Sequence, residues 1–203
     1  MVQIIFYMSK LEDFIYIKDF ALSPEICEEI CLKYELTEGK HAGKTFGGVT
    51  PDVKDTIDFT IPTNDDKWKR VFNILLNSIK EEMANYKEQL QKKTGNVYVN
   101  HEIYLSGMMI QKYDKNKGKY TWHNDQHTDI SGNNLICRQV TYIFYLNDVE
   151  HGGETEFKFL KIKPKRGRLL FFPSDEIYKH RGNVPISNDK YIITNWLTYL
   201  LQN

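Results

Sequence analysis

The chain of 203 residues has little of what marks membrane-spanning, nucleic-acid-binding or secreted proteins. Basic and acidic residues balance at 27 each, and a net charge of zero argues against a dedicated nucleic-acid binder, which usually carries a basic excess. The apolar runs are shorter than the ~18–20 residues that span a bilayer. Residues 1–8 are apolar, but they have no basic region before them and no small-residue cleavage site after them. We therefore expect no signal peptide, no membrane anchor and a cytoplasmic location.

Cysteine is also scarce. Cys27 and Cys31 are one helical turn apart, Cys137 is isolated, and the sequence has no CxxC pair. An odd number of cysteines without such a pair favours neither a disulfide framework nor a zinc knuckle. We interpret all three as reduced, buried thiols.

The residues that are abundant predict a folded domain. Hydrophobic residues make up 41% of the chain, and it contains 13 Tyr and 11 Phe, which rules out intrinsic disorder. A chain of this length fits one domain with a substantial core. We therefore predict a single domain over residues 1–203, with residues 1–95 supporting a core formed by residues 96–203.

The first half has mainly helical signals. An alternating strand is expected at residues 14–19, and a helix begins after Ser23 because serine is a favoured N-cap and proline follows it. A longer amphipathic helix is predicted over residues 64–90, ending near Gly95. Between the helices, the Gly-rich residues 39–52 read as a loop that is long enough to be a lid.

The second half has the texture of a β protein, with short β-rich runs separated by Gly, Pro and Asn turns. Because no helical segment separates these runs, a parallel α/β sheet is disfavoured. The predicted fold is α+β with a mainly β core, a sandwich or jelly roll covered by N-terminal helices. The expected strands are 97–99, 103–111, 138–146, 155–159, 168–172, 177–180 and 190–200.

Residues 123–129 contain two His-x-Asp triplets, His123/Asp125 and His127/Asp129. Alternate residues of a strand share a face, so either triplet could direct two ligands to one ion. With a distant histidine, such a pair forms the 2-His-1-carboxylate triad that holds Fe(II) and leaves open positions for a 2-oxo acid and O2. A His-x-Asp triplet alone is a weak signal, since structural histidines are common on strands.

Two later residues strengthen this interpretation. His180 lies at the predicted end of a short strand and supplies the distant histidine, and Lys190 opens the last predicted strand. A cation there could pair with the distal carboxylate of a dicarboxylic 2-oxo acid. We prefer the pair His123/Asp125, because His127 and Asp129 lead into the 131–134 turn, where strand alternation is less regular.

Residues 104–200 resemble the Fe(II)/2-oxoglutarate-dependent dioxygenases, and within them the prolyl 4-hydroxylase group. The resemblance is carried by Met109-x-x-x-Tyr113, Tyr120-x-x-His123-x-Asp125, Arg138-x-x-Thr141-x-x-x-Tyr145-Leu146-Asn147, Gly152-Gly153-Glu154-Thr155-x-Phe157, Pro164-x-x-Gly167-x-x-x-Phe171, His180, Lys190 and Trp196. The family fold is a double-stranded β-helix (jelly roll) with supporting helices. One departure is the sequence Asn188-Asp189-Lys190, where the family often has Gly-x-Lys.

The resemblance implies a role for each matching position. The iron ligands would be His123, Asp125 and His180. The 2-oxoglutarate site would contain Lys190, Tyr113, Thr141, Tyr145 and Thr194, with Lys190 and Tyr113 on the C5 carboxylate. The residues facing the substrate would be Arg138, Tyr120 and Trp196.

The implied activity is hydroxylation that consumes Fe(II)-bound 2-oxoglutarate and O2 and releases succinate and CO2, with ascorbate as an accessory reductant. Peptidyl proline is the expected substrate, and a free amino acid or small metabolite is the alternative, for which Arg138 would bind the carboxylate. A non-catalytic, iron-free jelly-roll binding module is the competing class. The residues do not define an oligomeric state.

Two polar segments, residues 41–51 and 126–137, are expected near the triad. In the family, matching loops close over the substrate and exclude water from the reaction. We predict that both are mobile without substrate and shape specificity, with Arg138 and Trp196 as the floor beneath them. The basic residues between 161 and 168 flank a Pro and a Gly, which favours a solvated β-turn over a nucleic-acid patch.

Overall fold

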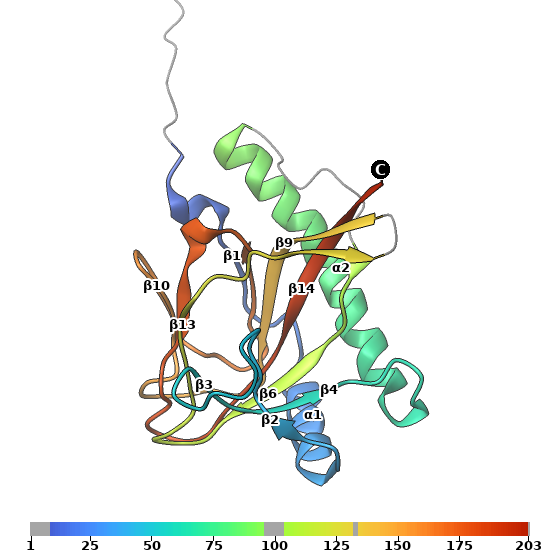
Figure 1. The fold of residues 1–203 in the computed structure, drawn as a ribbon, viewed down its shortest axis with the longest axis vertical. Coiled ribbons are helices and arrows are strands. Elements are labelled where there is room, and N and C mark those ends of the chain that lie inside the picture. Colours follow the sequence, from blue (N-terminus) through green and yellow to red (C-terminus); the bar gives the residue numbers. More distant parts are fainter. Residues whose placement is uncertain (1–8, 96–103, 132–133, 203) are drawn as a thin grey trace, which may run out of the picture.

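The computed structural model describes residues 9–95, 104–131 and 134–202. Two sheets built from antiparallel pairs form the body of the molecule, and a long helix lies along one side of the larger sheet (Figure 1). The predicted α+β class with a jelly-roll core and supporting N-terminal helices is confirmed. Among the described helices, none is long and apolar enough to cross a membrane.

The larger sheet has nine strands. Its order is β1 (Tyr16–Lys18), β12 (Leu169–Pro173), β9 (Asn134–Tyr145), β14 (Lys190–Gln202), β6 (Met109–Tyr113), β4 (Ile57–Thr60) and β2 (His41–Ala42), with β5 (Tyr104–Leu105) on β14 and β8 (Thr128–Ser131) on β9. The smaller sheet has the order β11 (Lys161–Ile162), β10 (Thr155–Phe157), β13 (His180–Gly182), β7 (Lys119–His123) and β3 (Lys54–Asp55).

The first helix begins, and the second ends, at the residue expected from the sequence. Helix α1 (Pro24–Leu36) starts after Ser23, whose side chain accepts a hydrogen bond from the Ile26 backbone N–H. Helix α2 (Asp66–Thr94) ends at Gly95, which adopts a left-handed conformation with φ of 71°. The second helix therefore continues one turn beyond the predicted residue 90.

Alternation along β9 divides the core into two layers. Val140, Tyr142 and Phe144 pack in the same apolar cluster as the buried faces of α1 and α2. The intervening Ile143 and Tyr145 belong to a second cluster together with residues of the smaller sheet. Alternate side chains of the long central strands therefore point into the space between the two sheets. The site lies in this space.

Three predicted elements were wrong in detail. The strand predicted at residues 177–180 begins only at His180, because the Asp175 carboxylate accepts the Ile177 and Tyr178 backbone N–H groups and closes a 3-10 turn, η2 (Glu176–Tyr178), before it. Another 3-10 turn, η1 (Leu11–Phe14), occupies the start of the predicted first strand. The third concerns residues 126–137, which are largely a β8–β9 hairpin, with Thr128 opposite Cys137, and not a loop.

The first half also contributes strands that the sequence did not reveal. β4 pairs with β6, β3 pairs with β7, and β2 extends the larger sheet beyond β4. These strands are two to four residues long, too short for a periodic pattern. They place the segment around residues 43–50 beside the site. The predicted strand at 97–99 lies outside the described residues.

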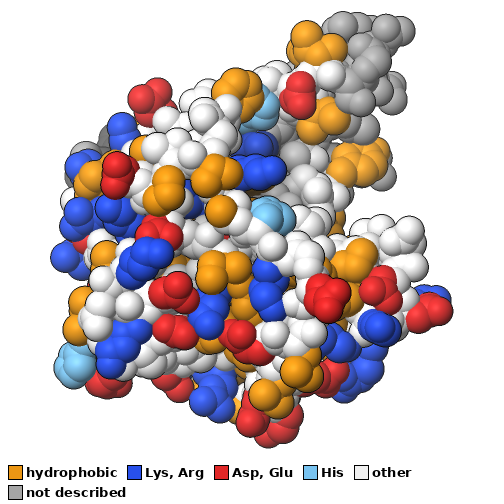
Figure 2. Space-filling model, turned by 60° about the horizontal axis from the view of Figure 1, so that its bottom comes forward, with side chains coloured by type: hydrophobic (Ala, Val, Ile, Leu, Met, Phe, Trp, Pro, Cys, Tyr) orange, Lys and Arg blue, Asp and Glu red, His pale blue; other side chains and the backbone are white. Residues whose placement is uncertain are grey.

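Charges of both signs are interspersed over the face that Figure 2 shows. The basic run at 161–168 follows this pattern. Lys161 pairs with Glu156 and Lys163 pairs with Glu150, while both Lys165 and Arg168 pair with Asp19. Mutual ion pairs of this kind fit the predicted solvated turn.

Candidate metal centre

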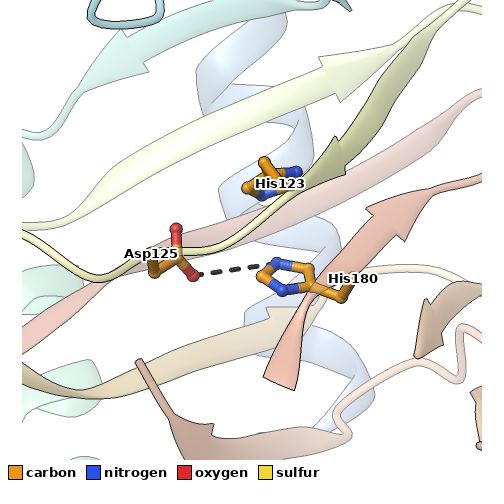
Figure 3. Close-up of side chains that lie close together, drawn as sticks. All are labelled: His123, Asp125 and His180. Carbon is orange, nitrogen blue, oxygen red and sulfur yellow. Dashed lines mark ion pairs between the residues drawn. The ribbon is translucent and has the colours of Figure 1, made fainter. Parts of the chain in front are cut away.

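Two strands and one loop bring His123, Asp125 and His180 together between the sheets (Figure 3). His123 is the last residue of β7, and His180 is the first residue of β13 and lies directly opposite it. One ligand atom from each of the three residues lies within 4.8 Å of the others. The expected convergence is present, but strand alternation is not its cause, because Asp125 follows the end of β7 and reaches the histidines from a loop.

Backbone carbonyls orient both imidazoles. Nδ1 of His123 lies 2.8 Å from the Thr121 carbonyl oxygen, and Nδ1 of His180 lies 3.0 Å from the Tyr178 carbonyl oxygen. A carbonyl only accepts hydrogen bonds, so each Nδ1 carries a proton, and Nε2 is the nitrogen of each ring that is left for a metal. This is the arrangement of a histidine that ligates a metal through Nε2.

A chain of hydroxyl groups holds the carboxylate. Thr141 Oγ1 donates to Asp125 Oδ2 at 2.7 Å, and Ser174 Oγ lies 2.9 Å from Thr141 Oγ1, so Ser174 donates to Thr141. Asp125 Oδ2 also lies 3.7 Å from His180 Nε2. Burial favours the neutral carboxyl, but the two histidines and the Thr141 hydroxyl outweigh it and lower the pKa of Asp125, which keeps the carboxylate ionised.

Aromatic side chains pack against the histidines. The Tyr120 ring stacks on the His123 imidazole with centroids 3.5 Å apart, and the Phe172 ring meets His180 edge-on at 4.8 Å. Burial, with His180 nearby, lowers the pKa of His123, so its imidazole is neutral and able to ligate. Tyr120, predicted to face substrate, thus also fixes a face of one ligand.

Lys190 is a buried cation in the lining of the same cavity. Its side chain is almost inaccessible, with an exposed fraction of 1%, and its ammonium donates to the Gly153 carbonyl at 3.0 Å. It lies 3.8 Å from the Tyr113 ring centroid and has no carboxylate partner among the described residues. Burial lowers the pKa of Lys190 to about 7, against a weaker opposing effect of Glu154. An anionic ligand would supply the missing counter-charge.

The other residues assigned to the cosubstrate fall into two groups. Tyr113, Thr141 and Thr194 line the cavity of about 90 Å³ that contains the triad and Lys190. Thr194 Oγ1 donates to the Tyr142 carbonyl, and the Tyr113 hydroxyl donates to Gln111. Tyr145 does not line this cavity. It is buried behind Thr155, to which its hydroxyl donates at 2.7 Å.

A groove of about 440 Å³ adjoins the cavity and shares Lys44, Tyr120, Asp125 and Trp196 with it. Arg138 lies in this groove with its guanidinium 3.3 Å above the Trp196 ring. His127, the rejected ligand, also lies in the groove, with its ring 5.5 Å from that of Phe46. The segments that meet at the groove are those predicted as lids, residues 44–46 and the start of the 126–137 hairpin.

Sequence reasoning missed a buried ion pair in the cavity wall. Lys54 Nζ lies 2.7 Å from Asp58 Oδ2, and their exposed side-chain fractions are 3% and 1%. Thr56 Oγ1 donates to the other oxygen of Asp58. Next to this pair, a Cβ on Gly43 would lie 2.1 Å from Thr56 Oγ1, so glycine is required there. The alternating Lys54-x-Thr56-x-Asp58 pattern is the one signal that could have revealed the pair.

The donor set fits an iron centre that binds 2-oxoglutarate. Two imidazoles held through Nδ1, with Nε2 left for a metal, and one ionised carboxylate form the ligand set of non-haem Fe(II) oxygenases. Lys190, buried without a carboxylate, is the cation that a dicarboxylic 2-oxo acid requires. Fe(II) and 2-oxoglutarate therefore match the residues present in the lining of one cavity.

Comparison with known proteins gives the same result. Residues 108–198 match the family model of the 2OG-Fe(II) oxygenase superfamily. The chain is 29% identical over 119 residues to prolyl 4-hydroxylase 13 of Arabidopsis thaliana, a match that covers 46% of this chain. The match spans 43% of the Arabidopsis protein, so this chain corresponds to less than half of that relative.

Solved structures share the fold. A prolyl hydroxylase from Trichoplax adhaerens, solved with a peptide fragment of a hypoxia inducible factor, has a TM-score of 0.69 at 20% identity and covers 91% of this chain and 83% of its own. The viral collagen prolyl hydroxylase of Paramecium Bursaria Chlorella virus-1, solved with 2OG, has a TM-score of 0.63 at 19% identity. That match covers 92% of this chain and 96% of the viral one.

Proposed function

We propose, on the premise that residues 108–198 belong to the 2OG-Fe(II) oxygenase superfamily, that this chain is an Fe(II)- and 2-oxoglutarate-dependent dioxygenase that hydroxylates peptidyl proline. The observation that carries the proposal is the placement of the His123–Asp125–His180 triad and the buried, carboxylate-free Lys190 in one cavity. The superfamily supplies the iron and 2-oxoglutarate chemistry, and the substrate is our inference.

In this proposal His123, Asp125 and His180 hold Fe(II). The bound iron supplies O2 activation, coupled to decarboxylation of 2-oxoglutarate, so that one oxygen atom enters the substrate C–H bond and the other enters succinate. The protein keeps the ligands in place through the Thr121 and Tyr178 carbonyls.

Lys190 and Tyr113 would bind the C5 carboxylate of 2-oxoglutarate. The pairing of β6 with β14 places these residues opposite each other, and the Lys190 ammonium lies against the Tyr113 ring. Charge-assisted hydrogen bonds to a carboxylate are stronger than neutral ones, particularly in a buried site. Thr194 and Thr141 line the same cavity, where Thr141 has the further task of orienting Asp125.

A groove that extends past the triad favours a peptide over a free amino acid. It adjoins the cavity and is lined by Trp196, Arg138 and Phe46, and Phe46 is 97% exposed. A single amino acid bound at the triad would not contact Phe46, whereas an extended peptide would cover its exposed ring. The relatives that carry prolyl hydroxylase names support the same choice.

The test is a screen for product mass. Proline-containing peptides and free amino acids are incubated with the protein, Fe(II) and 2-oxoglutarate, and both the added oxygen and the succinate are quantified. We expect hydroxylated peptide in step with succinate. Activity on free amino acids alone would show that the substrate is a free amino acid and not a peptide. Succinate formation that is absent, or that does not depend on iron, would support a non-catalytic binding module.

A further inference from the structure

The lining of the cavity and groove is strongly asymmetric in charge, although the whole chain has no net charge. Four cationic side chains line these two spaces, and among the described lining residues Asp125 carries the only carboxylate. Asp125 is committed to the metal triad. The cations are Lys44, Lys54, Arg138 and Lys190.

Two of the four cations are already accounted for by an ion pair or by the proposed cosubstrate. Lys54 is neutralised by Asp58 at 2.7 Å, and Lys190 lines the cavity proposed for 2-oxoglutarate. That leaves Lys44 and Arg138, which both line the groove. Neither has an ion-pair partner among the described residues. Elsewhere the chain pairs its basic side chains readily, as at Lys112 and Arg181.

Arg138 is held in a way that leaves its charge available. Its guanidinium lies 3.3 Å over the Trp196 ring centroid, and Nη1 makes one long contact of 3.4 Å with the Asp125 backbone carbonyl. A guanidinium presents up to five N–H donors in a planar fork that matches a carboxylate. Neighbouring polar side chains in the groove, Asn124 and Gln126, are neutral amides and provide no counter-charge.

We propose that the substrate carries a carboxylate close to the carbon that is hydroxylated, and that Arg138 and Lys44 bind this carboxylate together. This rests on the proposed function and names a feature of its substrate. The carboxylate has two possible sources, an Asp or Glu side chain beside the target residue of a peptide or the α-carboxylate of a free amino acid. The exposed Phe46 in the lining of the groove favours the peptide.

The experiment compares matched substrates that differ in one charge. Proline peptides with Asp or Glu at each position within three residues of the proline are paired with the same peptides carrying Asn or Gln. Free proline is paired with prolinamide. KM and turnover are measured for wild type, Lys44→Gln and Lys44→Arg, with Lys69→Gln as control, because Lys69 is exposed on α2 and away from the groove.

We expect at least one acidic peptide to have a KM about tenfold below that of its amide counterpart, since a charge-assisted contact contributes on the order of one decade of affinity. Lys44→Gln should remove most of this difference, Lys44→Arg should retain it, and Lys69→Gln should leave it unchanged. The difference should shrink as ionic strength rises, because Lys44 is exposed.

A lower KM for free proline than for prolinamide, with no difference between the acidic and amide peptides, would support the carboxylate site and identify its ligand as the α-carboxylate of a free amino acid. Equal KM values for all acidic and amide pairs would overturn the inference while leaving the dioxygenase intact. A Lys44→Gln effect on the 2-oxoglutarate KM alone would also overturn it, because the cations would then serve the cosubstrate. Absence of any iron-dependent hydroxylation would overturn both the inference and the proposed function.

Discussion

His180 lies directly opposite His123 in the antiparallel pairing of β13 with β7, and their imidazole centroids are 4.2 Å apart. Opposite positions on neighbouring strands are the closest that two strands offer, so this register alone delivers two ligands to one ion. The third ligand, Asp125, comes from the loop that leaves β7 and is fixed by Thr141.

The first prediction concerns which histidines bind the metal. His123→Ala and His180→Ala should each abolish tight binding of Fe(II), or of Mn(II) as a redox-stable substitute, measured by titration calorimetry. His127→Ala is the matched control from the competing His-x-Asp triplet. It should retain metal affinity because its ring packs on Phe46 in the groove. Loss of metal binding in His127→Ala with retention in His123→Ala would reverse our choice.

The second prediction concerns the support of Asp125. Thr141→Val removes the hydroxyl that donates to Asp125 while keeping nearly the same shape, and metal affinity should fall about 10–100-fold, as is typical when a hydrogen bond to a ligand is lost. Thr194→Val is the control, because its hydroxyl donates to a backbone carbonyl and not to a triad residue. Equal metal affinity in the two variants would contradict the support role.

The third prediction concerns cosubstrate affinity. Lys190→Ala should raise the 2-oxoglutarate KM roughly ten-fold to a thousand-fold, because it leaves a buried carboxylate without its partner, at a cost of ~2–5 kcal/mol. Metal affinity, measured without 2-oxoglutarate, should be retained. An unchanged KM would show that the C5 carboxylate binds elsewhere.

The fourth prediction concerns pH. Burial lowers the pKa of Lys190 to about 7, so the ammonium is charged below that pH and progressively neutral above it. Binding of a carboxylate favours the charged form, so affinity for 2-oxoglutarate should be highest below pH 7 and weaken as pH rises. Calorimetry between pH 6 and pH 9 measures this. Lys190→Arg stays charged throughout and should flatten the profile. A wild-type affinity for 2-oxoglutarate that rises with pH would contradict the predicted direction.

The fifth prediction concerns the ion pair in the cavity wall. Lys54→Met should leave the buried Asp58 carboxylate without its cation and lower the free energy of unfolding by ~3–5 kcal/mol. Lys117→Met breaks an exposed pair with Asp55 and should cost less than ~1 kcal/mol. Denaturant titration of both variants gives the comparison. Similar losses would mean that the Lys54 pair contributes no more than a surface contact.

The chemistry of the site could be predicted from the sequence because its ligands lie in short motifs. His123-x-Asp125, the distant His180 and Lys190 all lie in the cavity where the resemblance placed them. The predicted reason was partly wrong, since Asp125 is on a loop and His180 begins its strand after the turn that Asp175 closes. Tyr145, assigned to the pocket by the resemblance, does not line it and donates its hydroxyl to Thr155, which does.

What the sequence could not reveal depends on pairing between distant segments. β3 and β4 are too short to show a period, and their place in the two sheets depends on partners 49 to 66 residues away. The Lys54–Asp58 pair and the approach of Lys44 to the groove depend on those pairings. The N-terminal half therefore contributes site residues whose position beside the cavity no local pattern could predict.

The most direct test of the account is to run the reaction under ¹⁸O₂ with Fe(II), 2-oxoglutarate and a proline peptide that the screen identifies as substrate. We predict one labelled oxygen atom in succinate and one in the hydroxylated peptide, in equal amounts, and neither product with His123→Ala. Labelled succinate without labelled peptide would contradict hydroxylation of that substrate. Succinate that carries no label, or that forms without iron, would contradict the dioxygenase itself.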